Sequence, residues 1–244
     1  LTQLILDLGG RTQKKCKECG MEYVPSNSED VAAHKKFHRT SIEGVDLGKL
    51  FLSRLGEKNK MWTGDDGALI AVVTRQDPLY MRIKAKAVLD VVNEELGAAP
   101  MTDEEVWDQV VTGNADDSPY TREHRNKIYL YIDGSKCVGA LLGQRLVEAH
   151  RIITEEPPRD EQPSDMPWAR PPVARIPADT ESQAPPTFLG ISRVWTAKNH
   201  RRRNIAHTLC HTATKTFFLG QPLPKDSVAF SQPTNLGRKL AAKF

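Results

Sequence analysis

The chain has 244 residues, of which 39% are hydrophobic and 27% are charged, and its formal net charge is +3. This length allows one large domain, or one domain with a small appendage. No apolar run is long enough to cross a bilayer and no signal-peptide pattern opens the sequence, so we exclude a membrane protein and expect an intracellular one. The mild positive charge permits contact with nucleic acid but does not require it.

The first residue and the cysteines add two expectations. Leu1 stands where an initiator Met is expected, so we interpret the chain as a fragment of a longer protein. Cys16 and Cys19 lie close together, whereas Cys137 and Cys210 are isolated. This distribution is not a disulfide framework, and in a reducing compartment it predicts a pair of metal ligands and two ordinary core residues.

The segment from Cys16 has the spacing C-x2-C-x14-H-x3-H, which ends in His34 and His38. Two thiolates from a tight knuckle and two imidazoles from successive helical turns can converge on one tetrahedral ion. Gly20 lets the knuckle turn, and Ser28 with Asp30 suits a helix start. The alternative is a set of unrelated surface cysteines and histidines, but ligand type, order and spacing all favour structural Zn²⁺ bound by Cys16, Cys19, His34 and His38.

The first helical turn of this finger argues against DNA reading. Fingers that read DNA present side chains from the start of the helix, where this chain has Glu29, Asp30, Ala32 and Ala33. Acidic residues there repel phosphate. We therefore favour a structural or protein-docking finger within residues 1–40, which include a preceding strand, and leave direct DNA contact open.

Residues 41–62 are expected to form a connector, and residues 63–244 the main domain. Apolar patterning predicts a strand within 67–77, a helix from Pro78 to Gly97, and a short helix over 103–111 with Thr102 as its N-cap. Two β-rich runs over 127–150 flank Asp133-Gly134, which is a strong hairpin signal.

The last third of the chain begins with a proline-rich insertion at about 155–187. Nine of the 16 prolines lie between Glu155 and Phe188, and such a composition does not pack a core, so we expect a mobile segment between strands. A strand then leads through a basic turn into a helix that reaches about Leu219. A strand over 227–234 and a terminal helix from about Asn235 follow, and the order of elements predicts a mixed α/β sheet flanked by helices.

The basic turn contains His200, Arg201, Arg202 and Arg203 in succession. A strand that runs directly into a helix aims backbone N–H groups at whatever lies before the helix, which is a site for phosphate. The adjacent guanidinium groups suit a pyrophosphate and a further phosphate, as in coenzyme A. A nuclear-import signal or a DNA contact is the alternative, but a position between a core strand and a core helix favours phosphate.

Here the sequence resembles a known family. Residues 201–206 are similar to the R-x-x-G-x-A/G turn of the GCN5-related N-acetyltransferases, with Asn204 in place of the usual glycine. The stretches "CKECGMEYVPSNSEDVAAHKKFH", "GISRVW", "RRRNIAHTL" and "VAFSQPTNLGRKLA", in this order, resemble the sister-chromatid cohesion establishment acetyltransferases. That resemblance implies a C2H2-type zinc finger joined to a GCN5-related acetyltransferase domain, in a C-terminal fragment.

The resemblance also implies a function. The expected activity is transfer of the acetyl group of acetyl-CoA to a lysine of the SMC subunit of cohesin, in the nucleus and on chromatin. Replication-fork or chromatin proteins are expected further partners. Two rivals stay open: a non-catalytic chromatin- or DNA-binding module with a degenerate acetyltransferase fold, and an acetyltransferase whose substrate is a histone tail or the protein itself.

The catalytic assignment is incomplete. A lysine with a pKa of about 10.4 must lose a proton before it attacks a thioester. The family positions associated with catalysis correspond to Ser192 and Gln232, and because Gln232 cannot take a proton it would orient the lysine or a water molecule. Glu148 and His150 are titratable alternatives near the hairpin end, unless they are solvated strand-end residues. Ser192 could equally be a small strand residue.

The expected cofactor contacts come from three segments. Strand backbone pairs with the pantetheine amides, the turn holds the pyrophosphate, and the residues after the last strand close over the thioester. Trp195 either walls this site or belongs to the core. The expected cofactor-binding residues are Val194, Trp195, Thr196, Arg202, Arg203, Asn204, Ile205, Ala206, His207, Thr234, Asn235 and Leu236.

Overall fold

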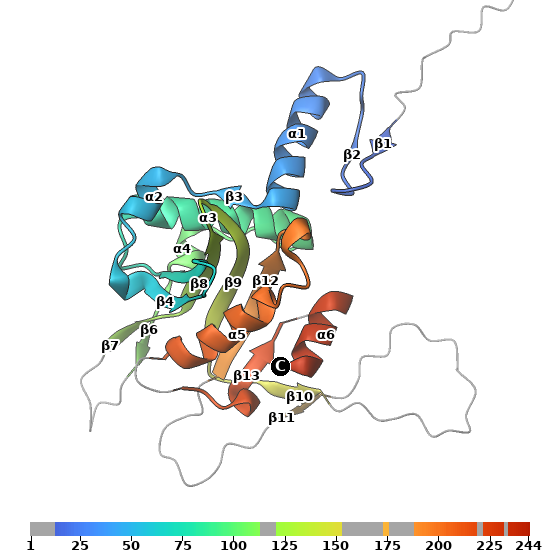
Figure 1. The fold of residues 1–244 in the computed structure, drawn as a ribbon. Helices are drawn as coiled ribbons and strands as arrows, with labels where there is room; N and C mark the ends of the chain where they lie inside the picture. Colours follow the sequence, from blue (N-terminus) through green and yellow to red (C-terminus); the bar gives the residue numbers. More distant parts are fainter. Residues whose placement is uncertain (1–12, 113–120, 153–172, 176–187, 219–221, 232–233) are drawn as a thin grey trace, which may run out of the picture.

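The computed structural model describes residues 13–112, 121–152, 173–175, 188–218, 222–231 and 234–244. Figure 1 shows a central sheet with helices on both of its faces and helix α1 rising from one end. This arrangement confirms the predicted α/β class with a mixed sheet. Within the described ranges, no helix is long and apolar enough to cross a membrane.

The central sheet contains seven strands in the described part of the chain, in the order β13-β12-β9-β8-β5-β4, with β3 also paired to β9. Only the β12–β13 pair among them is parallel. The strands are β3 (Val45–Asp46), β4 (Lys60–Thr63), β5 (Leu69–Val73), β8 (Asn126–Asp133), β9 (Lys136–Leu146), β12 (Phe188–Thr196) and β13 (Val228–Phe230). Strands β8 and β9 form the predicted hairpin, in which Gly134 has a φ of 59°.

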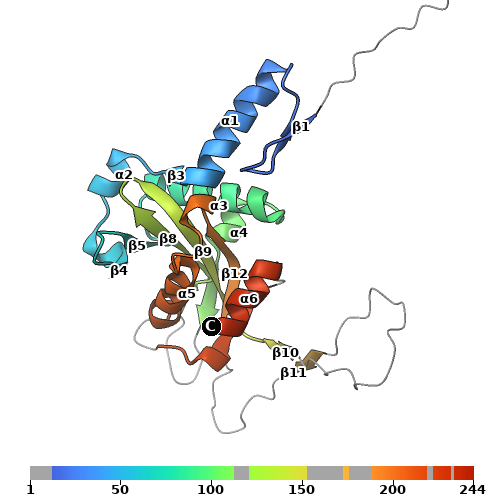
Figure 2. The same cartoon turned by 45° about the vertical axis from the view of Figure 1, so that its right-hand side comes forward.

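Two helices cover the two faces of this sheet (Figures 1 and 2). Helix α3 (Leu79–Leu96) buries Met81, Ala85, Val88 and Val92 at helical spacing, and it ends at Gly97, whose φ is 62°. Both its existence and its end confirm the sequence prediction. Helix α5 (Ile205–Thr216) packs against β9, β12 and β8 on the other face.

The close approach of α5 to the sheet depends on glycines in β9. A Cβ at Gly139 would lie 2.6 Å from Ile205 Cγ2, at the first residue of α5. A Cβ at Gly143 would lie 3.1 Å from the Phe217 ring, at the other end of the helix. The two glycines lie four residues apart and therefore on the same face of the strand. They determine how closely each end of α5 packs against the sheet.

The predicted helix over 103–111 is wrong in its second half. Helix α4 (Asp103–Val106) begins at the predicted N-cap, Thr102, whose side chain accepts a hydrogen bond from Glu105 N at 3.2 Å. The chain then becomes strand β6 (Gln109–Thr112), which pairs with β7 (Thr121–His124). The β-branched run Val110 to Thr112 favours a strand once a partner is present.

Residues 41–62, the expected connector, are instead folded into the domain. They contain the last residues of α1 (Ser28–Glu43), then β3, α2 (Lys49–Ser53), the 3-10 turn η1 (Glu57–Asn59) and most of β4. Leu47, Phe51 and Leu55 from this segment are buried in the core. The apolar residues of this segment are too few to show a helical or strand periodicity, so the sequence did not identify them as part of the core.

The remaining elements complete the C-terminal part. Strand β10 (His150–Ile152) pairs with β11 (Val173–Arg175), so three residues of the expected insertion have a strand partner. The rest of that insertion lies outside the described residues, and its mobility stays a prediction. The turn η2 (Lys198–His200) links β12 to α5, η3 (Lys225–Ser227) precedes β13, and α6 (Asn235–Lys243) follows it.

Candidate metal centre and cofactor cleft

The predicted zinc ligands come together in the N-terminal finger. The ligand atoms of Cys16, Cys19, His34 and His38 all lie within 4.8 Å of one another. A tetrahedral zinc ion with bonds of about 2.0–2.3 Å holds its ligand atoms roughly 3.3–3.8 Å apart, so these four donors are within reach of one ion. The cysteines come from the knuckle between β1 (Lys14–Lys15) and β2 (Glu22–Tyr23), and the histidines from α1.

The surroundings of these four side chains fit a metal. His34 Nε2 is buried and has no hydrogen-bond partner among the described residues, which is the state of an imidazole nitrogen reserved for an ion. His38 Nε2 lies 3.2 Å from a Glu18 carboxylate oxygen, the usual outer partner of a metal-binding histidine. Backbone hydrogen bonds from Cys19 and Glu18, followed by one from His34, lower the pKa of the Cys16 thiol to about 6. The donor set therefore suits structural Zn²⁺.

The finger is joined firmly to the main domain. Its helix α1 begins after Asn27, whose side chain caps Glu29 N at 2.9 Å, and continues to Glu43. Ser41 and Ile42 at its end are buried, and Glu43 forms a 2.6 Å ion pair with Lys136 of β9. The finger is therefore continuous with the central sheet through a helix, and no flexible linker separates them.

Strands β12 and β13 part beside a β-bulge. They pair only from Leu189–Val228 to Ile191–Phe230, whereas β12 continues its pairing with β9 as far as Thr196. The register with β9 shifts between Ile191 and Arg193, so Ser192 is the extra residue of the bulge. Beyond this point the edge of β12 that faced β13 has no strand partner among the described residues.

Hydrogen bonds fix the backbone where the two strands part. Ser231, just after β13, donates its hydroxyl to the Ser192 carbonyl at 2.8 Å. The Ser192 hydroxyl accepts from Arg193 Nη1 at 2.8 Å, and Arg193 Nε donates to Asn93 Oδ1 of α3 at 3.1 Å. Desolvation lowers the pKa of Arg193. The Ser192 hydroxyl is thus held by a partly buried guanidinium group.

The turn after β12 has an unusual backbone. Arg202 and Asn204 have φ values of 62° and 63°, and they are the non-glycine residues with positive φ in the described structure. Asparagine tolerates this left-handed region better than most residues, which fits the position of Asn204 where the family motif has glycine. Arginine adopts the same region at a cost of about 1–3 kcal/mol. Left-handed residues within a turn are typical of backbone segments whose successive N–H groups bind an anion.

The start of α5 leaves its amides available for a ligand. Asn204 is the N-cap, but its side chain makes no cap hydrogen bond. Its carbonyl accepts from Thr208 N at 3.0 Å, as the first helical bond. The N–H groups of Ile205, Ala206 and His207 have no acceptor among the described residues. Together with the positive end of the helix dipole, they form a site for an anion.

The three arginines of the turn do not share one direction. Arg201 and Arg202 line a cleft in front of α5. Arg203 lies instead beside the β8–β9 hairpin, with Nη1 2.9 Å from His200 Nδ1 and 3.7 Å from Asp133 Oδ2. Burial and then the charge of Arg203 lower the pKa of His200. Arg203 is thus engaged with the protein, away from the cleft.

The cleft has a volume of about 1060 Å³ and contains most of the residues predicted to bind a cofactor. The predicted cofactor-binding residues that line it are Val194, Trp195, Thr196, Arg202, Asn204, Ile205, Ala206, His207, Thr234 and Leu236. Ser192, predicted as a catalytic residue, lines it as well. Arg203 and Asn235 do not line it. Trp195 is only 3% exposed, and its Nε1 is buried without a partner in the described ranges, so it is both a core residue and part of the wall.

The predicted proton-handling residues are less well placed. Gln232 lies outside the described residues. Glu148 is exposed and does not line the cleft. His150 opens β10, and its side chain also falls outside the described structure. These three assignments therefore stay predictions.

Sequence reasoning missed a further part of the cleft wall. Leu96 to Ala99, at the end of α3, line one side, and Gly237, Leu240 and Lys243 of α6 line another. The four-residue spacing of Leu236 and Leu240 was an available signal for α6, because it places both on one helical face. Nothing in the local sequence marked the end of α3 as part of a site.

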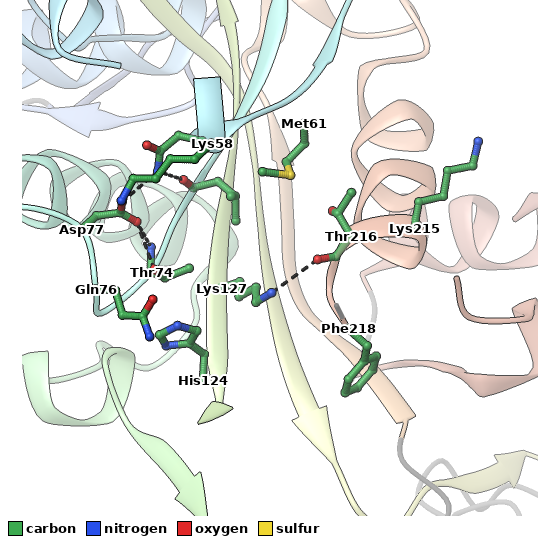
Figure 3. A pocket seen from close by; sticks show the side chains of 12 residues that line it. Lys58, Met61, Thr74, Gln76, Asp77, His124, Lys127, Lys215, Thr216 and Phe218 are labelled. Atoms are coloured by element: carbon green, nitrogen blue, oxygen red, sulfur yellow. Dashed lines mark hydrogen bonds and ion pairs between the residues drawn. The ribbon is translucent and has the colours of Figure 1, made fainter. Parts of the chain in front are cut away.

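A second hollow, of about 390 Å³, lies at the other end of α5 (Figure 3). Its polar groups are mostly held by the protein. The buried Asp77 accepts hydrogen bonds from Thr74 N at 2.8 Å and from Asn59 Nδ2 at 2.8 Å. Lys127 Nζ donates to the Phe217 carbonyl at 2.6 Å and so caps the end of α5. This hollow serves structure, and we place the candidate site in the larger cleft.

Taken together, these features define a class of protein. Two parallel strands separate beside a strand–turn–helix corner that suits an anion, and a Cys₂His₂ cluster lies in the N-terminal finger. This combination is typical of an acetyltransferase-type α/β domain with a zinc finger. Comparison with known families gives the particular group. The family described as "zinc-finger of acetyl-transferase ESCO" matches residues 3–40, and "ESCO1/2 acetyl-transferase" matches residues 185–244. The resemblance to cohesion establishment acetyltransferases is thereby confirmed.

Individual relatives agree with these matches. N-acetyltransferase ESCO2 of Homo sapiens is 31% identical over 99% of this chain, which spans 36% of that protein. N-acetyltransferase ECO1 of Candida glabrata is 26% identical, with 100% of this chain and 88% of the relative covered. A solved structure of the xEco2 acetyltransferase domain bound to a CoA conjugate has a TM-score of 0.51 at 24% identity, covering 76% of this chain and 91% of that one. It supports the fold.

Proposed function

We propose that this chain is an acetyl-CoA-dependent protein lysine N-acetyltransferase that acts on the SMC subunit of cohesin. The observation that carries the proposal is the cleft between the parted strands β12 and β13 and the free amides at the start of α5. It offers a strand edge and an anion site in one continuous groove. The solved relative that carries a CoA conjugate supports the choice of ligand.

The free edge of β12 suits the pantetheine arm of the cofactor. Val194 to Thr196 keep their pairing with β9 on one side, and on the other side β13 has already turned away. Pantetheine contains two amides in an extended chain, which can hydrogen-bond to a strand edge as an added strand does. The thioester then lies near Ser192, where the strands separate.

The turn suits the pyrophosphate. The N–H groups of Ile205, Ala206 and His207 supply donors, and Arg201 with Arg202 supply two positive charges. Backbone donors position the phosphates, and guanidinium groups provide charge-assisted bonds worth about 1.5–3 kcal/mol each.

The acetyl transfer itself requires a proton acceptor. The lysine Nζ attacks the thioester carbonyl, the C–S bond breaks, coenzyme A leaves as thiol, and the amine gives up a proton. The histidines that line the cleft in the described structure, His200 and His207, both belong to the corner that is proposed to hold the pyrophosphate. His200 already contacts Arg203 at 2.9 Å. His207 stacks on His211 with 6.3 Å between ring centroids, and its backbone N–H group is assigned to the pyrophosphate, so neither histidine is proposed as the proton acceptor at the thioester. Glu148 and His150 stay the proposed acceptors, with Gln232 as an orienting partner.

The substrate and the location follow from the resemblance. A cohesin SMC lysine is the proposed acceptor, and the nucleus is the proposed compartment, because the relatives are ESCO-type N-acetyltransferases. The finger supports a docking role, since the first turn of α1 carries Glu29 and Asp30. Histone tails and the protein itself are the competing acceptors, and a non-catalytic chromatin-binding module is the competing function.

The test is a mass-spectrometric transfer assay with acetyl-CoA and three acceptors: a cohesin SMC head peptide, a histone tail peptide and the protein alone. We expect acetylated lysine chiefly on the SMC peptide. An Arg202→Gln variant should lose most of this transfer, whereas Arg203→Gln, which faces Asp133, is the matched control. Absence of transfer to every acceptor, together with absence of acetyl-CoA binding, would leave the non-catalytic module as the better reading.

A further inference from the structure

Lys198 connects the zinc knuckle to the turn that precedes the cofactor cleft. Its ammonium group donates to the carbonyl of Cys19 at 2.6 Å and to that of Glu18 at 3.2 Å. These contacts join positions that are 179 and 180 residues apart in the chain. Lys198 is half-buried, and it lies over Gly20, where an added Cβ would be 4.0 Å from Nζ. The contact is therefore part of a packed interface between α1 and η2.

The same residue opens the turn that forms the anion site. Lys198 is the first residue of η2, and its carbonyl accepts from Arg201 N at 3.4 Å. Arg201 in turn donates through Nε to the Thr196 carbonyl at 3.2 Å, and the strained Arg202 follows directly. Arg201 and Arg202 follow Lys198 by three and four residues in the same turn. A displacement of Lys198 should therefore also displace both of these cleft arginines.

The other end of this contact depends on the metal. The strands around the knuckle, β1 and β2, have two residues each, and Cys19 and Val24 are its buried apolar residues within the described part of the finger. So small a core does not hold a knuckle in place, and in such modules the metal supplies most of the folding energy. The Glu18 and Cys19 carbonyls keep their positions opposite Lys198 only while the four ligands are drawn together.

We infer that Lys198 is a positioning residue through which zinc binding in the finger strengthens cofactor binding in the cleft. The inference rests on the proposed function, because the ligand of the cleft is acetyl-CoA. It makes the finger more than a docking module: zinc keeps the knuckle carbonyls in place, these fix Lys198, and Lys198 fixes the turn that carries Arg201 and Arg202. Because coupling between binding sites is reciprocal, acetyl-CoA must also tighten zinc binding by the same factor.

The experiment compares the wild-type chain with Lys198→Met and with a matched control, Lys17→Met. Lys17 is an exposed lysine of the same knuckle, so its replacement removes the same charge and spares the contact. For each protein, zinc content is measured first, and acetyl-CoA affinity is then measured by calorimetry before and after chelation. The rate of zinc transfer to a chromogenic chelator is recorded with and without saturating acetyl-CoA.

We expect chelation to weaken acetyl-CoA binding by about 5- to 10-fold in the wild type and in Lys17→Met, a typical coupling between sites. Zinc-loaded Lys198→Met should retain its metal, bind acetyl-CoA as weakly as the chelated wild type, and show less than about a 2-fold further effect of chelation. Acetyl-CoA should slow zinc release in the wild type but not in Lys198→Met.

Two other results have distinct meanings. If the wild type binds acetyl-CoA equally well with and without zinc, or if Lys198→Met keeps the full zinc dependence, the inference is overturned while the proposed function stands. If the zinc-loaded wild type binds no acetyl-CoA at all, the proposed function fails, and the inference fails with it. A Lys198→Arg variant, which can still donate to both carbonyls, should restore most of the coupling.

Discussion

The two hollows of the domain lie at opposite ends of α5, and they differ in how their polar groups are partnered. At the start of the helix, backbone amides have no acceptor in the described part of the chain, and Arg202 is held in a left-handed conformation. At the end of the helix, Lys127 caps the Phe217 carbonyl, and Asp77 accepts hydrogen bonds from Thr74 and Asn59 (Figure 3).

This difference separates a site for a ligand from a site for stability. Buried polar groups are normally paired within the protein, and strain at the backbone is tolerated mainly where function requires it. The start of α5 departs from both rules and the end of α5 largely obeys them. Substitutions at the two ends should therefore divide cleanly between cofactor affinity and folding stability.

The largest effect should come from the cleft arginines. Replacing both Arg201 and Arg202 with Gln removes two positive charges that line the cleft. Each charge-assisted bond contributes about 1.5–3 kcal/mol, or about 10- to 100-fold, so calorimetry should show at least a 100-fold loss of acetyl-CoA affinity. The thermal midpoint should hardly change. Equal loss of affinity in the single variant Arg203→Gln would show that Arg203, and not only Arg201 and Arg202, contacts the cofactor.

Asp77→Ala should lower folding stability and leave cofactor affinity unchanged. It removes a buried carboxylate that Thr74 and Asn59 contact, and it leaves the Thr74 N–H without its acceptor. We expect the free energy of unfolding in urea to fall by about 2–4 kcal/mol, with acetyl-CoA affinity unchanged at temperatures where the variant is folded. Asp90→Ala, which breaks an exposed ion pair with Lys86, is the control and should cost less than about 1 kcal/mol. A marked fall in the acetyl-CoA affinity of Asp77→Ala would contradict this separation, because it would show that the far hollow also contributes to cofactor binding.

The glycines of β9 allow the two ends of α5 to be compared on one strand. In Gly139→Ala the new methyl group meets Ile205, and in Gly143→Ala it meets Phe217. Overpacking of this kind costs about 1–3 kcal/mol in either case. Only Gly139→Ala should also weaken acetyl-CoA binding, because it displaces the residue whose N–H lies in the anion site. Similar affinities for the two variants would mean that the depth of the helix start does not matter.

The smallest effect concerns pH and His124, which lines the far hollow. Burial, and then the charge of Lys127, lower the pKa of His124 in the folded protein. The unfolded chain therefore binds a proton at a pH where the folded chain does not, and stability must fall as pH drops from above 6.5 through the folded-state pKa. His124→Gln should flatten this part of the stability curve measured by urea unfolding at pH 7.5 and pH 5. The pKa values of His200 and His211 are lowered as well, so some pH dependence should remain.

Local patterns predicted much of both sites. The ligand spacing of Cys16, Cys19, His34 and His38 is a property of a knuckle and one helix, and it needs no tertiary information. The strand–turn–helix corner was likewise visible, and Asn204 adopts the left-handed backbone that its place in the motif required. Cys137 and Cys210 are fully buried, as ordinary core residues, and burial raises the pKa of each to about 12.

The features that the sequence did not predict all depend on residues that are distant in the chain. Residues 109–112 became a strand because β7 pairs with them, although the preceding turn is helical. Arg203 points away from the cleft because Asp133, on the hairpin, lies beside it. The contact of Lys198 with the Cys19 carbonyl joins residues that are 179 positions apart, and no local pattern encodes it. Such contacts depend on the tertiary fold.

Amide hydrogen exchange, measured with and without acetyl-CoA, compares the two ends of α5 in a single experiment. If the cleft is the cofactor site, acetyl-CoA should slow exchange in peptides covering residues 194–208, whose amides lie along β12 and at the start of α5. Peptides covering residues 57–77 and 121–127, around the far hollow, should exchange as before. Protection confined to the far hollow, or at neither end under saturating acetyl-CoA, would contradict the assignment of the cleft.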